Sequence, residues 1–398
     1  YATPEIMRKH IDRLALRLAN VGIDIEVLDF YHDPSKKAIQ RAKRTLVALG
    51  AMTSKGEVTN IGRQMEQFPV ESSYARMLIE ATQYPKEIQT KLAAIIAIQE
   101  VGGIIKGGTK YTGWRKYTRQ TRSDLLAQYD VYLALPNILP DDYEEMGIIS
   151  KNVGKAKEVI ERLDRDLSLD DTQLLAITAS DEEALQRSII SGQIDQLWSV
   201  TESGDVEHIF TGQQRELSGS TVVRNPKLVA GTPFDLQVPT RSGGLETLHL
   251  LQGVTAVNTD WLIELAPQLF ANRRGRLFYD PRIGSLAERQ QVRFGKRVLE
   301  GASIPRLEDT SENRKLFVKE YARWAYEQLE RQRRQLERFH TRVPSIALRH
   351  VEQEVAIRAN GIVSLDQLSS DGKRTMIALS KLETYLGDSF VHHLGKPR

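Results

Sequence analysis

The spacing of the apolar residues changes near Leu197, and this change limits the folds that the chain can adopt. From Ser72 to about Ile194, apolar residues recur at the three- and four-residue intervals of buried helix faces. After Leu197, apolar and polar residues alternate in short segments that glycine and serine turns separate. Such segments are typical of strands in a small barrel or sandwich. We therefore expect a multidomain α+β protein in which a helical bundle precedes a β-barrel.

The N-terminal part predicts two helices followed by a hairpin. The stretch Ser54-Lys55-Gly56-Glu57 has a glycine in the turn, and Met52 and Val58 flank it in short extended pieces. Two helices and a hairpin indicate a winged helix that ends near residue 70. Because 398 residues are too many for one ordinary core, we expect two to four domains along the whole chain.

The composition excludes several classes of protein. The chain has no cysteine, which excludes disulfides and thiolate zinc sites and fits a cytoplasmic location. No apolar run approaches the ~20 residues that span a bilayer, so we expect no membrane partner. The formal net charge of +3 does not decide for or against nucleic acid, because basic residues can cluster on one face. His392 and His393 have no third ligand beside them, so we expect surface residues and no metal site.

Two segments have a distinctive pattern of residues. The segment 253–267 reads GVTAVNTDWLIELAP, and the segment 42–81 contains Leu49-Gly50-Ala51, Thr59-x-x-Gly62-Arg63-x-Met65, Phe68-Pro69-Val70 and Ala75-Arg76-Met77-Leu78. The segment 42–81 resembles the region behind the motor of DEAH/RHA-type ATP-dependent RNA helicases. The segment 253–267 resembles the end of the OB fold in the same helicases. A third segment, 279–295, has an extended character with a turn at Asp280-Pro281, and it resembles only the more bacterial members of this family.

The resemblance implies an order of domains. It implies a winged helix over 1–70, a helical ratchet domain over 71–194, an OB-fold barrel over 195–280 and a mainly helical C-terminal extension over 281–398. It also implies that the motor domains precede residue 1 in the same parent polypeptide, which fits an N-terminus that lacks an initiator methionine and opens directly on a helix. The expected function is then to grip single-stranded RNA or DNA, with a regulatory protein as a further candidate partner.

The chain itself lacks the motifs of an ATPase. A helicase motor needs a glycine-rich loop that ends in Gly-Lys-Ser/Thr and an acidic motif that holds magnesium. The Gly-Lys pairs at 154–155, 295–296 and 372–373 lack both the hydroxyl and the preceding glycine. Asp181-Glu182 fits the first turn of a helix better, where acids face the positive end of the helix dipole. We expect no catalytic residue and no cofactor in this chain; ATP and magnesium would belong to the motor domains.

The segment 106–122 interleaves cations, aromatic residues and glycines without any acid. Cations near phosphates release counterions, and exposed aromatic rings stack on unpaired bases. The glycines predict a loop, and the simplest alternative is a solvated surface loop whose aromatics pack locally. The resemblance adds Ser123, which begins a helix that faces the bound strand in the family. The candidate residues are Lys106, Lys110, Tyr111, Trp114, Arg115, Lys116, Tyr117, Arg119, Arg122 and Ser123.

A second candidate site lies in the barrel stretch RELSGSTVVRNPK. OB folds bind single strands on one face and between their loops. Basic and hydroxyl residues suit phosphate oxygens, although they also suit any exposed loop. The resemblance favours a contact with the nucleic-acid backbone, through Arg215, Ser218, Ser220, Arg224 and Lys227.

Two other functions stay open at this point. A winged-helix regulator could place a basic helix in a DNA major groove, and the cations of the predicted second helix are Lys36, Lys37, Arg41, Lys43 and Arg44. In the helicase family this domain is mainly a platform against the motor. A motor-less adaptor could instead scaffold proteins through the long charged helix 313–341, although its aromatic residues indicate packing against a core.

Overall fold

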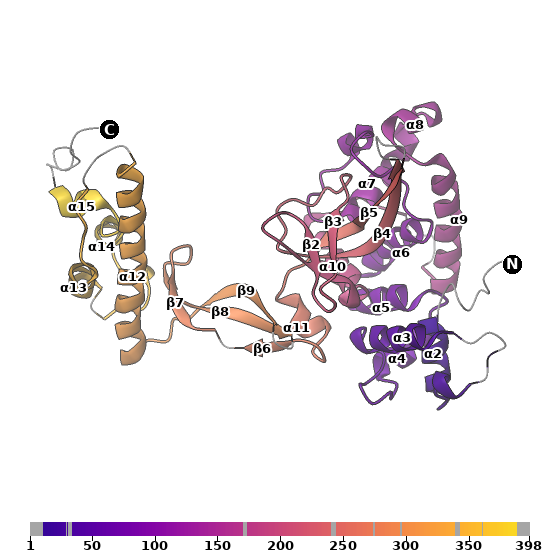
Figure 1. The fold of residues 1–398 in the computed structure, drawn as a ribbon, viewed down its shortest axis with the longest axis horizontal. Helices are drawn as coiled ribbons and strands as arrows, with labels where there is room; N and C mark the ends of the chain where they lie inside the picture. Colours follow the sequence, from indigo (N-terminus) through magenta and orange to yellow (C-terminus); the bar gives the residue numbers. More distant parts are fainter. Residues whose placement is uncertain are drawn as a thin grey trace. The chain divides into compact units, whose positions relative to one another are not determined.

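The chain forms two compact units, one up to Phe270 and one from Ala271 on (Figure 1). The computed structural model describes residues 11–28, 30, 34–169, 173–239, 244–273, 275–294, 297–338, 343–359 and 361–387. These residues include many helices and a closed five-stranded barrel, so the expected mixed α+β class is confirmed. His392 and His393 lie outside the described residues. None of the described helices is both long and apolar enough to cross a membrane.

Three helices and one β-bridge form the start of unit 1. The helices are α2 (Ile11–Asn20), α3 (Lys36–Ala48) and α4 (Asn60–Glu66). Met52 and Val58 form an isolated antiparallel bridge between α3 and α4. The hairpin expected around Gly56 is therefore present as this single bridge, with Gly56 at a φ of +88° in the turn.

The Thr59-x-x-Gly62 pattern has a local structural reason. The Oγ1 of Thr59 accepts a hydrogen bond from the N–H of Gly62 at 3.1 Å and thereby caps α4. The same hydroxyl donates to the carbonyl oxygen of Gly50 at 2.6 Å. A Cβ atom on Gly62 would lie 2.2 Å from the carbonyl oxygen of Ala51, so no larger residue fits there.

Six further α-helices occupy the segment that was predicted to be helical. They are α5 (Ser72–Ala81), α6 (Lys86–Glu100), α7 (Asp124–Ala134), α8 (Tyr143–Met146), α9 (Ser150–Leu167) and α10 (Ala179–Ser191). The residues of α6 from Leu92 to Ile98 are each at most 1% exposed. A helix that is apolar on all sides must be enclosed by others, so α6 forms the centre of this bundle.

The acidic pair Asp181-Glu182 lies in the first turn of α10, as expected. Asp181 and the N-cap residue Thr178 form a capping box, with Oδ2 accepting from the N–H of Thr178 at 2.9 Å. Lys91 of α6 lies 2.6 Å from the same carboxylate. The pair therefore stabilises a helix start and its contact with α6.

The strands that follow close into the barrel of unit 1. They are β1 (Leu197–Val200), β2 (Val206–His208), β3 (Gln214–Leu217), β4 (Leu228–Pro239) and β5 (Leu245–Ala256). Their order around the barrel is β1-β2-β3-β5-β4, and only β3 and β5 run parallel. Trp198, Val229 and Leu251 are fully buried in its core. After β5, the short helix α11 (Trp261–Leu265) places Glu264 2.6 Å from Arg187 of α10.

Unit 2 combines a four-stranded antiparallel sheet with four helices. The strands are β6 (Ala271–Arg273), β7 (Leu277–Asp280), β8 (Ser285–Phe294) and β9 (Arg297–Pro305), and β8 pairs with each of the other three. The helices are α12 (Ser311–Leu336), α13 (Leu348–Arg358), α14 (Ser370–Ala378) and α15 (Leu382–Leu386). Phe317, Tyr321 and Leu329 of α12 are buried, so the interpretation of its aromatic residues as core contacts is confirmed.

Strands β8 and β9 begin the segment 281–398, and the helices α12 to α15 follow them; the extended character of the stretch 279–295 agrees with β7 and β8. Within β8, Leu286, Ala287 and Glu288 are all buried in succession, so apolar and polar residues do not alternate there. Glu288 is buried because Arg306 binds its carboxylate, with Arg306 Nε 2.9 Å from Oε2. An ion pair inside the unit thus occupies a position that a strand pattern would give to an apolar residue.

Candidate nucleic-acid interface

The two candidate segments meet in the structure, although about a hundred residues separate them in the sequence. The Nη2 atom of Arg115 donates to the carbonyl oxygen of Ser220 at 2.9 Å. The backbone N–H of Arg224 donates to the carbonyl oxygen of Thr121 at 3.2 Å. We call this contact the seam, and it consists of residues 106–124 on the helical side and residues 218–227 and 253–256 on the barrel side.

Asp124, at the start of α7, binds both barrel segments of the seam. Its carboxylate accepts hydrogen bonds from the Oγ1 of Thr221 at 2.9 Å and from the N–H groups of Val222 and Val254 at 2.8 and 2.9 Å. Burial raises the pKa of this carboxyl, although the hydrogen bonds that it accepts act in the opposite direction. The interior of the seam is therefore a polar network built on one acid.

The raised pKa of Asp124 predicts a pH dependence of stability. The folded state keeps this proton at pH values where the unfolded chain, with a carboxyl pKa of about 3.9, has lost it. The stabilisation is therefore complete below that value and is lost as the pH rises through the raised pKa. An Asp124→Asn variant has no carboxyl at this position and does not lose this stabilisation. The free energy of unfolding of the variant minus that of wild type should therefore rise with pH above about 4. Chemical denaturation over a pH series measures it, and a constant difference would contradict the assignment.

Ser123 lies inside the seam rather than on its surface. The residue is fully buried, and its Oγ lies 2.8 Å from the Oγ1 of Thr255 on β5. Its Oγ also accepts from the N–H of Leu126 and so caps α7, the helix that was predicted to begin here. In this structure Ser123 fastens the helix to the barrel and has no surface to offer a strand.

Two glycines of neighbouring loops allow those loops to approach the segment 106–122 closely. Gly219 of the barrel faces Thr109, because a Cβ atom on Gly219 would lie 2.8 Å from Thr109 Cγ2. Gly147, with a φ of +80°, faces Tyr111 in the same way, at 2.6 Å from its Cβ. The segment is therefore a folded loop supported by its neighbours.

The three aromatic residues of this loop differ in how far they are buried. Trp114 is only 2% exposed, packs in an apolar cluster and donates from Nε1 to the carbonyl oxygen of Tyr111 at 3.1 Å. Its predicted role as a base-stacking residue does not agree with this burial, because the core covers its ring. Tyr111 and Tyr117 are half-buried. Lys116 Nζ lies 5.0 Å from the centre of the Tyr117 ring, and Lys110 Nζ lies 5.2 Å from that of Tyr111.

Six predicted site residues are exposed cations at the seam. None of the six forms an ion pair with another residue that the structure describes. Because they come from both sides of a contact that buried hydrogen bonds hold together, their positive charges are concentrated on one region of unit 1. They are Lys110, Lys116, Arg119 and Arg122 of the helical side, and Arg224 and Lys227 of the barrel side.

The other predicted cations and hydroxyls have partners within the protein. Lys106 pairs with Glu144 at 3.2 Å. Arg215 is 8% exposed and lies 2.6 Å from the carboxylate of Asp235, and the same Nη1 donates to the carbonyl oxygens of residues 234 and 250. Ser218 and Ser220 bond to each other, with 2.9 Å between their hydroxyl oxygens. These side chains therefore bind within the protein and shape the barrel loop.

The basic face of α3 carries less unneutralised positive charge than its sequence indicated. Lys43 Nζ lies 2.8 Å from Asp24 and 3.1 Å from Glu26, so two acids neutralise it. Lys36, Lys37 and two arginines remain exposed on the helix. The seam therefore holds more unneutralised cations than this face.

Asp124 was not among the predicted site residues. An acid directly after a capping serine predicts only a favourable charge in the first turn of a helix. The donors that it binds lie about 100 and 130 residues further along the chain. No local pattern could have indicated them.

A comparison with known proteins identifies a helicase-related region in the chain. No family model matches the sequence. Over 86 residues, or 21% of this chain, the sequence is 40% identical to the ATP-dependent RNA helicase HrpA of Borreliella burgdorferi. The match spans about a tenth of the length of that relative.

Proposed function

We propose that this chain is the nucleic-acid-binding accessory region of a DEAH/RHA-type ATP-dependent helicase. Residues 1–70 form its winged helix, 71–194 its ratchet domain, 195–280 its OB fold and 281–398 a C-terminal extension. The seam grips single-stranded RNA or DNA while motor domains outside this chain hydrolyse ATP. The name of the similar protein, an RNA helicase, supports RNA as the strand.

The observation that carries this proposal is the group of six exposed cations at the seam. Two of them, Arg224 and Lys227, come from the barrel, and the other four come from the loop before α7. Cations that meet a phosphate backbone release counterions, which supplies affinity without sequence preference. A motor that moves along a strand needs such a grip, since it must hold every sequence equally.

The barrel supports the proposal through its topology. A five-stranded Greek-key barrel that binds oligonucleotides through one face and its loops is the description of an OB fold. The order β1-β2-β3-β5-β4, with β3 parallel to β5, is compatible with it. The barrel-side cations of the seam lie in the loop that follows β3 and leads into β4.

The seam also suits a single strand better than a duplex. The rings of Tyr111 and Tyr117 are half-exposed beside lysines, so unpaired bases can reach their edges while the cations contact phosphates. Asp124 and Arg115 hold the two sides at a fixed distance, which preorganises the cations. Bases and backbone would then be held together through each ATP cycle.

Fluorescence-anisotropy titrations with single-stranded RNA, single-stranded DNA and a duplex of the same sequence test this function. Both single strands should bind more tightly than the duplex, with an affinity that falls steeply as salt rises. Tighter, sequence-dependent binding to the duplex would contradict the proposal and favour a DNA-binding regulator. Absence of binding to any nucleic acid at low salt would favour a protein-scaffolding adaptor.

A further inference from the structure

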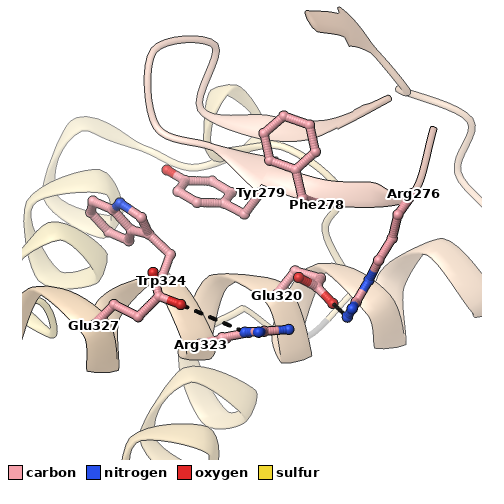
Figure 2. Close-up of a pocket in the computed structure, with 7 residues that line it drawn as sticks. All are labelled: Arg276, Phe278, Tyr279, Glu320, Arg323, Trp324 and Glu327. Atoms are coloured by element: carbon pink, nitrogen blue, oxygen red, sulfur yellow. Dashed lines mark hydrogen bonds and ion pairs between the residues drawn. The ribbon is translucent and has the colours of Figure 1, made fainter. Parts of the chain in front are cut away.

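A pocket in unit 2 lies between strand β7 and helix α12 and belongs to no site described so far. Its volume is about 240 Å³, and three aromatic and four charged residues line it. Figure 2 shows the rings of Phe278 and Tyr279 on one side and the charged side chains of α12 on the other. Trp324 of α12 and Arg276 before β7 complete the lining, so the pocket combines aromatic and charged groups from both elements.

The aromatic walls of the pocket are held in place by the core. Tyr279 is 5% exposed, and its ring centre lies 4.6 Å from that of Tyr321 and 5.7 Å from that of Phe317. Trp324 is half-buried, with its ring centre 5.2 Å from that of Tyr279. Tyr279 thus supports the wall from the core, and the partly exposed rings of Phe278 and Trp324 offer the surface that a flat group can enter at little cost in conformational entropy.

The charged side of the pocket offers donors and acceptors in equal numbers. Arg276 Nη2 lies 2.6 Å from Glu320, whose side chain is 6% exposed. Arg323 Nε lies 3.6 Å from Glu327, one helical turn further along α12. Two guanidinium groups and two carboxylates balance each other, so the pocket favours neither a simple anion nor a simple cation.

A nucleobase has the chemistry that this arrangement fits. Its flat ring can stack on aromatic side chains, and its edge carries both donors and acceptors. Guanine fits best, because a guanidinium can donate to its O6 and N7 atoms and a carboxylate can accept from its N–H groups.

The surface of α12 next to the pocket favours a strand over a free nucleotide. Lys315, Lys319 and Arg323 follow each other at four-residue intervals, so they lie on one face of the helix, and all three are exposed. The row covers about 12 Å, at 1.5 Å for each helical residue. A row of cations that leads to a pocket can hold the phosphates that flank a bound base.

We propose that the pocket between β7 and α12 holds one unpaired guanine of a single strand whose phosphates lie along Lys319 and Lys315. This site lies wholly in unit 2 and goes beyond the proposed function of the seam. It would add a base preference to a seam that grips without one.

The test compares uridine oligonucleotides that carry one guanine, one adenine or no purine, by anisotropy with the full chain. The guanine oligonucleotide should bind roughly tenfold more tightly than the uridine one, which is the scale of one stacked base. Trp324→Ala should remove this preference, and Trp324→Phe should restore most of it. Glu327→Gln should lower the preference several-fold, whereas the matched control Glu312→Gln, at the far end of α12, should not change it.

Three results would overturn the inference. The first is equal affinity for all three oligonucleotides. The second is competition by free guanosine monophosphate at the concentrations at which the oligonucleotide competes, which would assign the pocket to a free nucleotide. The third is that the protein binds an arginine-rich peptide, that Glu327→Gln abolishes this binding, and that the affinity for the oligonucleotides stays unchanged. Because Glu327 is exposed, its substitution keeps the test valid if Trp324→Ala fails to fold. If seam variants lose the salt-dependent binding but keep the guanine preference, the seam and the pocket are distinct sites.

Discussion

Replacing Lys116, Arg119 and Arg122 with glutamate is expected to weaken the binding of single-stranded RNA by roughly thirtyfold or more at low salt. All three side chains are exposed on the helical side of the seam. For a single strand, each lost phosphate contact lowers the slope of log affinity against log salt by about 0.7, so the slope should fall by about 2. Anisotropy titrations at several salt concentrations measure both quantities.

Arg115 is left unchanged in this variant for a structural reason. Its guanidinium binds the carbonyl oxygen of Ser220 and lies 4.8 Å from the ring of Trp114. Its loss would disturb the barrel loop as well as the charge, and a change in affinity would then have two explanations. The three exposed cations change the charge alone.

The matched control reverses Lys36, Lys37 and Arg44 on α3. These cations are exposed to a similar degree, and the total charge changes by the same amount. Because salt screens charges beyond about 10 Å, affinity for single-stranded RNA should stay within roughly twofold of wild type at 0.1 M salt. Equal losses in both variants would contradict a local grip at the seam. A greater loss in the α3 variant, with duplex DNA as ligand, would favour a regulator.

Asp124→Ala is expected to lower the free energy of unfolding of unit 1 by about 2–4 kcal/mol, because three donors lose their acceptor at once. Each unpaired buried donor costs about 1–3 kcal/mol, and the relief of a buried charge offsets part of the sum. The barrel segments at Val222 and Val254 should loosen first, since their N–H groups bind this carboxylate.

Hydrogen exchange localises this effect better than global unfolding, because a chain with two units need not unfold in one step. The amides of Val222 and Val254 should lose protection in Asp124→Ala, and urea denaturation should give the size of the loss. Asp141→Ala is a suitable control, because Asp141 is exposed in a neighbouring turn. Unchanged protection at both valines would show that Asp124 does not hold the seam.

Local patterns predicted the elements that local interactions determine. Ser123 caps α7 as expected, and Asp181 lies in the first turn of α10. The alternation after Leu197 predicted a barrel, and a closed barrel is present. In each case the interacting residues are neighbours in sequence, or the alternation follows from a strand with one buried face.

Local sequence patterns gave wrong predictions where residues elsewhere in the chain determine whether a side chain is buried. Trp114 lies in a basic loop, but an apolar cluster that reaches from Ile98 of α6 to Val222 before β4 buries it. In β8, the burial of Glu288 depends on its ion pair with Arg306, which lies on the far side of β9 in the sequence. Which cations stay exposed also depended on distant partners, as Arg115 and Arg215 show. The sequence identified the cations, but only the tertiary structure shows which of them stay exposed.

The contact of Gly219 with Thr109 restricts how such a protein can be recombined. In a barrel with any larger residue at position 219, that side chain would contact the loop before α7 too closely. A longer loop would contact the barrel too closely in the same way. A chimera that exchanges the barrel alone between two relatives should therefore assemble poorly. A chimera that exchanges the barrel together with the loop 106–122 should keep this contact and assemble better.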